Sequence, residues 1–463
     1  MKRLIPLAVV ITAGLIWAGI GAARSVERTT RDDSVSTVAL SAGTGAPDEV
    51  IQWNQELLTL LQVPGAQPAT IHPTRTMAIV QLAVFDAVDA VQEGRGQDST
   101  SFFEPDRASA AAAVAAAART SLLALLPSQQ QAIDAMYQSS IAQLGSSRTV
   151  LRGIRIGERA AEAILAARAD DGSASPAPPF GPGSGPGAYQ ATPPKLSAPV
   201  FGQWPNVTPF VLRSGDQFRP PPPPDLSSAR YVDDFNEVRA FGRLDSTSRS
   251  SNQTEIGKFW GAAPVWIVWN QVAESAAAGF HDTLAQNARL FAVLDAGLAD
   301  SVIALYDGKY AYNRWRPVTA ITAADTGNPT AASDPTWMPL AATAPDPSYP
   351  GAHATVSETA AVTLAEFFGT DNFAFSLTNP TLPGVVRSFA GFSQAADEAS
   401  ASRIFAGQHF RYDEDAGLAL GRQVGDFVSD HMLLESRTGL TVEAARQHHH
   451  NRHSHSRVVH ARR

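Results

Sequence analysis

The spacing of apolar residues predicts a chain made mostly of helices. From Val50 onward, apolar side chains recur at intervals of three and four residues, the period of a helix with one buried face. An alanine-rich run also favours helix through propensity alone. The predicted helices of the first half span residues 50–63, 74–92, 108–126, 128–144 and 150–170. No segment alternates convincingly as a strand does, so we expect an all-α protein of antiparallel helices packed as bundles.

The helical pattern breaks at residues 171–224 and then continues. The break is crowded with proline and glycine and ends in the run "RPPPPP", which excludes helix there. Its segment "FGQWPNVTPFVL" carries aromatic residues of the kind usually buried. We therefore interpret the break as a long loop wrapped around a helical body; a linker between domains is the alternative. Helices resume near Ser228, and the longest lies within residues 281–317.

Residues 1–23 have the pattern of a secretory signal peptide. Lys2 and Arg3 precede the apolar run "LIPLAVVITAGLIWAGIGAA", which ends in small residues suited to cleavage after Ala23. We therefore expect a secreted or extracytoplasmic protein. An uncleaved membrane anchor is the alternative, because the apolar run is long for a signal peptide, and it would be the chain's only contact with a membrane.

Three further regions are expected: a polar leader linker at 24–48, a single helical domain at 49–435 and a disordered tail at 436–463. The last eighteen residues hold six of the eleven histidines and five arginines but no acidic residue, so metal or anion binding by the tail is the alternative. The chain has no cysteine, which excludes disulfides and cysteine zinc sites. The net charge of −8 leaves the body acidic, which gives no support to nucleic-acid binding.

The first stretch with candidate chemistry is "KYAYNRWRP", at residues 309–317. Lys309 and Arg316 are nearly two helical turns apart, so on one helix both would face the same way, roughly 10 Å apart along the axis. Pro317 disfavours helical geometry at Arg316, so we expect the helix to end there, with Arg316 at the mouth of a loop. Two cationic arms so placed can converge on one anion; a solvated basic face is the alternative.

The second stretch is "YPGAHAT", at residues 349–355, after which apolar residues recur at every fourth position. This spacing places His353 in the first turn of a helix. The N–H groups of a first turn have no partner within the helix, and the helix dipole there favours negative charge. The small residues Gly351 and Ala352 let an anion approach these N–H groups, and His353 can exchange a proton with it.

The third stretch is "SRIFAGQHFRYDEDAG", at residues 402–417. Arg403 lies at the end of an alanine-rich helical run, and Gly407 suits the end of a helix. His409 falls in the break, and Asp413 is among the acidic residues that open the next helix. Asp413 is placed to orient the ring of His409 and raise its basicity, as carboxylates do for histidines that bind metals.

Together the three stretches supply three cations, an open helix N-terminus and two histidines. Three positive charges can neutralise a tetrahedral oxyanion such as phosphate or vanadate, and backbone N–H groups can fix its oxygens. One histidine would bind the central atom, and the other would manage protons on the opposite side. The sequence therefore predicts an oxyanion site whose first and last residues are about a hundred positions apart.

These residues resemble the tripartite motif of the vanadium-dependent haloperoxidases and the type 2 phosphatidic acid phosphatase-like enzymes. The motif reads lysine, six residues, Arg-Pro; then Pro-Ser-Gly-His; then Ser-Arg, five residues, histidine, three residues, aspartate. The matching residues are Lys309, Arg316, Pro317, Pro350, His353, Ser402, Arg403, His409 and Asp413. The flanking segments "RTMAIVQLAVFDAVDAV", "TEIGKFW", "WRPVTAI" and "TWMPL" are similar to the bacterial haloperoxidase branch, and the resemblance covers most of residues 50–435.

The resemblance implies the helical bundles of the vanadium haloperoxidase and acid phosphatase type, with long loops rich in proline and glycine. It implies vanadate as the cofactor, with the metal bound to His409. The residues that would hold the vanadate are Lys309, Arg316, Gly351, Ala352, His353, Arg403 and His409. His353 would act as the acid–base group, Asp413 would support His409, and Lys309 would withdraw charge from peroxide. The partners would be hydrogen peroxide, a halide and a small organic acceptor.

Two alternative functions use the same residues. In an acid phosphatase of the superfamily, His409 would attack phosphorus to form a phosphohistidine, His353 would protonate the leaving alcohol, and phosphate would take the place of vanadate. The other alternative is a non-catalytic secreted oxyanion binder. The flanking segments and the length lead us to favour the haloperoxidase.

The chain departs from the motif at one point. Gly351-Ala352 stands where the family has Ser-Gly, so the serine hydroxyl and its hydrogen bond to the oxyanion are lost. One neutral hydrogen bond is worth about 1 kcal/mol. The departure therefore bears on anion affinity and efficiency more than on the existence of the site.

Overall fold

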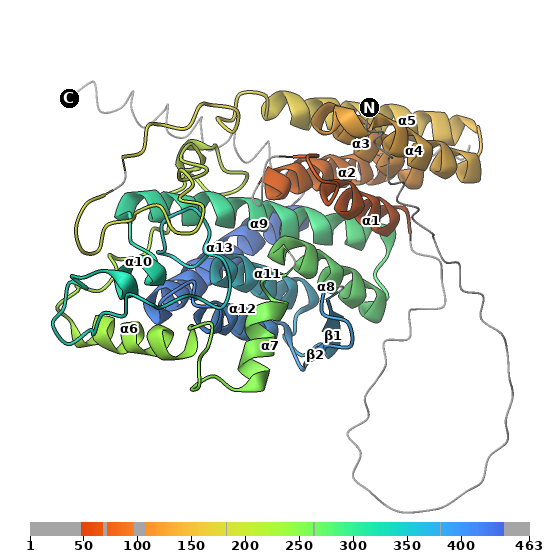
Figure 1. Cartoon of the computed structure of the whole chain (residues 1–463). Coiled ribbons are helices and arrows are strands. Elements are labelled where there is room, and N and C mark those ends of the chain that lie inside the picture. Colours follow the sequence, from red (N-terminus) through yellow and green to blue (C-terminus); the bar gives the residue numbers. More distant parts are fainter. Residues whose placement is uncertain are drawn as a thin grey trace, which may run out of the picture. The chain divides into compact units, whose positions relative to one another are not determined.

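Helices make up almost all the regular structure in the described part of the chain (Figure 1). The computed structural model describes residues 48–67, 72–96 and 108–438, apart from residues 182, 263 and 380. The predicted signal peptide, the leader linker up to residue 47 and the tail beyond residue 438 lie outside these residues and stay predictions. The predicted all-α fold class is confirmed.

Five helices follow the apolar pattern of the first half. They are α1 (Glu49–Leu61), α2 (His72–Gly96), α3 (Ala110–Leu125), α4 (Gln130–Leu144) and α5 (Arg148–Ala167), with a 3-10 turn η1 (Pro127–Gln129) before α4. Helices α3 and α5 pack against each other so closely that a Cβ atom on Gly153 would lie 2.3 Å from the carbonyl oxygen of Ser109. Glycine is therefore required at this crossing.

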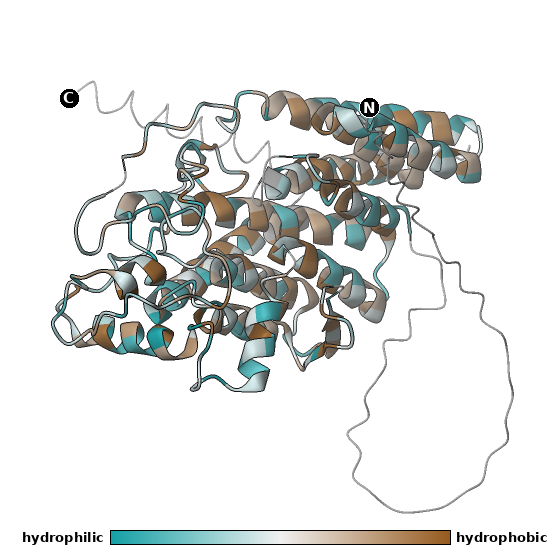
Figure 2. Cartoon of the chain, viewed as in Figure 1, coloured by the Kyte–Doolittle hydropathy of each residue, from teal (hydrophilic) through white to brown (hydrophobic). Residues whose placement is uncertain are grey.

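The central helix α9 (Leu284–Tyr312) joins the two halves of the fold. It is buried along most of its length, and it contacts α2 as well as α11 (Ala352–Phe368) and α13 (Arg411–Thr438) (Figure 1). Helices α11 and α13 also pack on each other. Figure 2 shows hydrophobic and hydrophilic residues side by side on most helices, as expected when only one face of a helix meets the core.

The remaining elements are shorter. They are α6 (Ala229–Phe241), α7 (Ser251–Phe259), α8 (Val265–Phe280), α10 (Pro317–Thr322), α12 (Phe392–Phe405) and an antiparallel hairpin of β1 (Phe375–Thr378) and β2 (Val386–Phe389). We expected no strands from the sequence, and this hairpin corrects that expectation. Each strand has four residues, which is too short for a period of two to be distinguished from chance.

The end of α9 corrects a second prediction. We expected Lys309 and Arg316 on one helix face, but α9 ends at Tyr312, and Asn313 closes it with a left-handed φ of 48°. Asparagine tolerates this conformation better than most residues. Arg316 is instead the N-cap of α10, which begins at Pro317. The two cations therefore belong to different elements.

The proline- and glycine-rich residues 171–224 contain one short element, the 3-10 turn η2 (Trp204–Asn206). This turn packs on α9, with Trp204 buried in the main core. Beyond it, Asp300 of α9 accepts hydrogen bonds from the backbone N–H groups of Phe210, Val211 and Leu212, at 2.6, 2.7 and 2.8 Å. The loop is thus fastened to the central helix, and the described residues all fall in one compact unit, Ala42–Arg463.

No single helix among the described residues has the length and apolar composition of a membrane span. The two criteria are met only by α3 together with the segment Pro127–Leu144, a pair that is bent by 118°.

We predict that Asp300→Ala lowers the free energy of unfolding by about 3 kcal/mol, because three N–H groups, two of them fully buried, lose their acceptor at once. Chemical denaturation followed by circular dichroism measures this change. Asp233→Ala, at an exposed position of α6, is the control and should change it by less than about 0.5 kcal/mol. Equal effects of the two substitutions would contradict the anchoring role of Asp300.

Candidate active site

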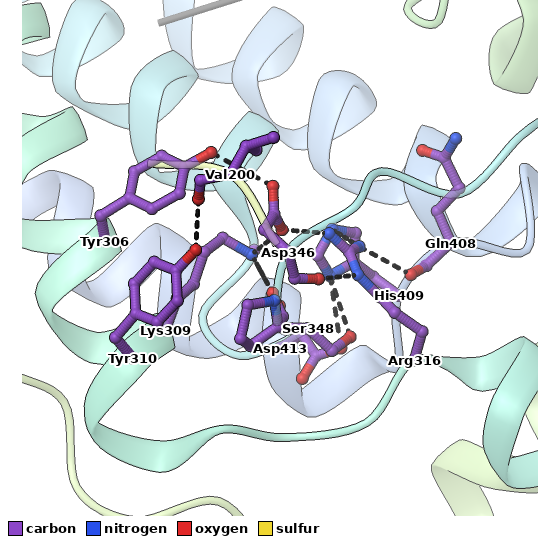
Figure 3. Close-up of polar contacts among 12 residues, drawn as sticks. Val200, Tyr306, Lys309, Tyr310, Arg316, Asp346, Ser348, Gln408, His409 and Asp413 are labelled. Atoms are coloured by element: carbon purple, nitrogen blue, oxygen red, sulfur yellow. Dashed lines mark hydrogen bonds and ion pairs between the residues drawn. The ribbon is translucent and has the colours of Figure 1, made fainter. Parts of the chain in front are cut away.

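The ends of several helices bring four of the predicted site residues together (Figure 3). Lys309 lies in the last turn of α9, Arg316 caps α10, His409 lies between α12 and α13, and Asp413 is in the first turn of α13. The loop before α11 adds Asp346, and all five side chains are buried. The site is therefore assembled by tertiary packing and not by one helix face.

Asp346 holds two of the cations. Its Oδ1 atom lies 3.1 Å from Nζ of Lys309 and also accepts from Nη2 of Arg316, and the hydroxyl of Tyr306 donates to Oδ2 at 3.1 Å. Burial by itself would raise the pKa of Asp346, but the charges of Lys309 and Arg316 outweigh burial and hold that pKa below its ordinary value. Asp346 is therefore ionised and neutralises part of the positive charge of the site.

The ammonium group of Lys309 has no exposed surface, and protein oxygen atoms are available as acceptors for its three hydrogens. Besides Asp346, Nζ contacts the carbonyl oxygens of Pro347 at 2.5 Å and Ser348 at 3.2 Å. Burial lowers the pKa of Lys309 to about 8, although the charge of Asp346 opposes this shift. Lys309 is thus a desolvated cation whose charge depends on its carboxylate partner.

The ring of His409 is oriented from both sides. Nη1 of Arg316 lies 2.8 Å from Nε2, and Nδ1 lies 3.3 Å from Oδ2 of Asp413. Arginine can only donate, so Nε2 accepts and Nδ1 carries the proton. Burial, and then the charges of Arg316 and Lys309, lower the pKa of His409 well below its ordinary value. His409 is therefore neutral, with a lone pair on Nε2 that faces the cations.

Asp413 is in turn held by its neighbours. Its Oδ2 atom accepts from the hydroxyl of Ser348 at 2.6 Å and from the backbone N–H of Phe410 at 2.9 Å. Burial raises the pKa of Asp413 to about 6, against the effect of these hydrogen bonds. This arrangement fixes the carboxylate that faces Nδ1 of His409.

Arg403 and Glu414 bring two buried groups with unused hydrogen-bonding capacity. Among the described residues, Nε and Nη1 of Arg403 and both carboxyl oxygens of Glu414 have no hydrogen-bond partner. Burial lowers the pKa of Arg403 to about 10, although the charge of Glu414 opposes the shift. Burial, and then the charge of Asp413, raise the pKa of Glu414 to about 8. Both side chains can therefore form hydrogen bonds with a polar ligand.

His353 lies in the first turn of α11, as predicted, and is half-buried. Its Nε2 atom lies 3.1 Å from the carbonyl oxygen of Trp260, so Nε2 donates and Nδ1 is left as an acceptor. Burial, and then the charge of Arg403, lower its pKa well below the ordinary value. The rings of His353 and His409 lie close enough for a charge on His353 to lower the pKa of His409.

The start of α11 differs from the prediction in one respect. We expected the N–H of Gly351 to face an anion, but it donates to the carbonyl oxygen of Asp413 at 2.8 Å. Gly351 is the N-cap, and Ala352 is the first helical residue. The open donors of this terminus are therefore the N–H groups of the first turn, beginning at Ala352, which have no partner within the helix.

The residues present fit an oxyanion. Three buried cations lie close enough to His409 for their charges to lower its pKa. Two of them already bind an oxygen anion that the protein itself supplies, the carboxylate of Asp346. The unpartnered nitrogens of Arg403 can donate to further oxygens. By contrast, no group of three or more His, Asp or Glu side chains in the described ranges is arranged to hold a metal cation directly.

Comparisons with known proteins point to vanadium haloperoxidases. A family model described as the VCPO second helical-bundle domain matches residues 289–435. The vanadium chloroperoxidase of Curvularia inaequalis is 27% identical over 289 residues, which make up 47% of this chain and 46% of that protein. The solved structure of a bacterial vanadium-dependent iodoperoxidase superposes with a TM-score of 0.70 at 26% identity, covering 82% of this chain and 95% of that one. The chain thus resembles the vanadium haloperoxidases in its second helical bundle and in its fold.

A second solved structure of the superfamily supports the fold alone. The holo form of a bacterial vanadium-dependent chloroperoxidase has a TM-score of 0.62 at 15% identity and covers 86% of this chain and 99% of that one. The match to the Curvularia protein spans about half the length of that protein. The segment that matches the family model contains every predicted site residue of this chain, from Lys309 to Asp413.

Sequence reasoning missed three polar residues of the site: Asp346, Ser348 and Glu414. Asp346 is 37 positions from Lys309, in a loop with no period that could have placed it. Ser348 gave no signal for the same reason. Glu414 was noted only as an acid at the start of a helix, although its direct neighbour Asp413 belongs to the superfamily motif.

We predict that Asp346→Asn destabilises the protein by about 3 kcal/mol, because Lys309 and Arg316 are left as buried charges without a carboxylate. Added inorganic phosphate should then stabilise the variant more than it stabilises the wild type, since the released cations gain an anion. Thermal unfolding with and without phosphate measures both effects.

The matched control for this prediction is Asp307→Asn. Asp307 also lies on α9 and pairs with an arginine, Arg219, at 2.6 Å, but that pair is not part of the site. Its loss should leave the response to phosphate unchanged. The role of Asp346 is contradicted if phosphate shifts the unfolding of the wild type and of Asp346→Asn equally.

Proposed function

We propose that this protein is a vanadate-dependent haloperoxidase that oxidises a halide with hydrogen peroxide and thereby halogenates a small organic acceptor. One observation carries the proposal: the neutral ring of His409 turns the lone pair of Nε2 toward Arg316 at 2.8 Å, while Asp413 faces Nδ1. This is the state that a histidine needs to bind a metal centre. The named relatives, which are vanadium chloroperoxidases and an iodoperoxidase, favour vanadate as that centre.

Different residues would bind the metal and the oxygens of the cofactor. His409 would bind the metal through Nε2, and Lys309, Arg316 and Arg403 would hold the oxygens. Asp346 would keep Lys309 and Arg316 in position. Its carboxylate and the cofactor would together balance the positive charge of these two residues. When bound, vanadate would supply a Lewis acid that activates hydrogen peroxide toward the halide.

His353 is the acid–base group of the proposal. Its Nε2 atom is engaged with the carbonyl oxygen of Trp260, which leaves Nδ1 free to take a proton from incoming hydrogen peroxide. The depressed pKa of His353 keeps the ring neutral and able to accept that proton. Arg403, whose charge lowers this pKa, would afterwards favour release of the proton from the ring.

The proposal extends to the location of the protein. The signal-peptide pattern of residues 1–23 supports export, with secretion or an extracytoplasmic site as the result. Vanadate, hydrogen peroxide, a halide and an organic acceptor would then all be met outside the cytoplasm.

We predict that purified protein loaded with orthovanadate halogenates an activated organic acceptor in the presence of hydrogen peroxide and bromide or iodide. Excess phosphate should compete with vanadate and suppress the reaction. His409→Ala should lose more than about 99% of the activity, because the metal loses its protein ligand. The control is His431→Ala, since His431 lies on α13 and contacts Phe427, outside the site.

A parallel assay separates the two enzymatic alternatives. Hydrolysis of a chromogenic phosphate ester, without halogenation, would replace the haloperoxidase by a phosphatase that uses His409 as its nucleophile. Vanadate binding without turnover in either assay would leave a non-catalytic oxyanion binder. Retained turnover in His409→Ala would refute the proposed centre in all its forms.

A further inference from the structure

Glu414 occupies the space that a side chain at position 351 would need. A Cβ atom built on Gly351 would lie 2.2 Å from Oε1 of Glu414 and 2.6 Å from its carboxyl carbon. Gly351 has a φ of −72°, which any residue can adopt. Glycine is therefore needed at this position for steric reasons and not for its backbone conformation. The side chain of Glu414 occupies the space that a larger residue would need.

The carboxyl group of Glu414 is buried without a partner. The residue is 0% exposed, and neither carboxyl oxygen makes a hydrogen bond within the described residues. Oε1 comes within 3.5 Å of Nδ1 of His409, but that nitrogen faces Asp413 at the shorter distance of 3.3 Å. A buried polar group of this kind is costly unless a ligand or water completes its hydrogen bonds.

Arg403 repeats the pattern with the opposite charge. Its Nε and Nη1 atoms are also buried and unpartnered, and yet they form no hydrogen bond with Glu414, whose charge they feel. A small molecule that contacts both groups would complete the hydrogen bonds of each. Such a molecule must offer acceptors to Arg403 and share a proton with a carboxyl group, as a protonated oxyanion does.

We propose that Glu414 is an anion-binding residue that takes over the place and the task of the serine that the superfamily motif has at position 351. One proton lies between a carboxyl oxygen of Glu414 and an oxygen of the bound vanadate or phosphate, whichever of the two brings it, and no covalent bond changes. Gly351 is small so that the carboxyl group can reach the anion. This inference rests on the proposed oxyanion site but not on the reaction catalysed there.

Binding of inorganic phosphate and of orthovanadate to the whole protein, measured by isothermal titration calorimetry, tests the inference without an activity assay. Glu414→Ala should bind either anion about tenfold more weakly, because one charge-assisted hydrogen bond is lost. Glu414→Gln keeps a donor of similar shape and should stay within about threefold of the wild type.

The double variant Gly351→Ser, Glu414→Ala gives the sharpest result. Serine then finds the space that Glu414 has vacated, so the double variant should bind about as well as the wild type, within about threefold. Gly351→Ser alone places its side chain against Glu414 and should bind worse than the wild type. Asp415→Asn, exposed and next in sequence on α13, is the control and should bind like the wild type. Denaturation curves show whether each variant is folded.

The outcomes separate this inference from the proposed function. Unchanged affinity in Glu414→Ala, or no recovery in the double variant, would overturn the role of Glu414 and leave the haloperoxidase proposal standing. Failure of the wild type to bind either anion would overturn both. Recovery by serine only in the absence of Glu414 is the result that a merely structural glutamate would not give.

Discussion

The pairing of Asp346 with Lys309 and Arg316 is the interaction on which the arrangement of the site depends. Two cations from different elements, the last turn of α9 and the cap of α10, are buried side by side and share one carboxylate oxygen. Two positive charges buried next to the same carboxylate oxygen would repel each other strongly without it, because the protein interior screens charge weakly. Asp346 makes the arrangement stable in the absence of a ligand, and so it allows a site with a high density of positive charge to fold.

The other charges of the site are balanced in a way that leaves it positive. Three cations face three carboxyl groups, those of Asp346, Asp413 and Glu414. Burial, however, raises the pKa of Asp413 to about 6 and that of Glu414 to about 8. Near neutral pH the carboxyl groups therefore carry fewer than three negative charges. The remaining positive charge is buried, so its attraction for an anion is screened little.

The sequence predicted the helices well because their stability comes from local patterns. Apolar periods, capping side chains and alanine content are properties of adjacent residues, and they located α1 to α5, the start of α11 and the break between α12 and α13. The end of α9 was misjudged because Pro317 was taken as the stop, whereas Asn313 ends the helix earlier through its left-handed conformation. A residue that can either continue or cap a helix gives no firm boundary from spacing alone.

The motif residues of the site could be named from the sequence, but their partners could not. Lys309, Arg316 and His409 are fixed by spacing that resembles a known pattern, whereas Asp346 and Ser348 lie in a loop whose path is set by tertiary packing. The engaged N–H of Gly351 was unforeseen for the same reason, since its acceptor is a carbonyl group of α13.

The three cations differ in the hydrogen bonds that they already make. This difference indicates which cation an incoming anion would contact first. Each contact of Nζ of Lys309 is to an oxygen of the loop at 346–348, and Arg316 is shared among that loop, Gln408 and His409. An incoming oxyanion must exchange with some of these contacts, which lowers its net gain in free energy there. Arg403 has two nitrogens with no hydrogen-bond partner in the described part of the chain, so these two nitrogens exchange no contact when an anion binds. We therefore expect an incoming anion to make its first strong contact with Arg403, because Lys309 and Arg316 are already engaged with Asp346.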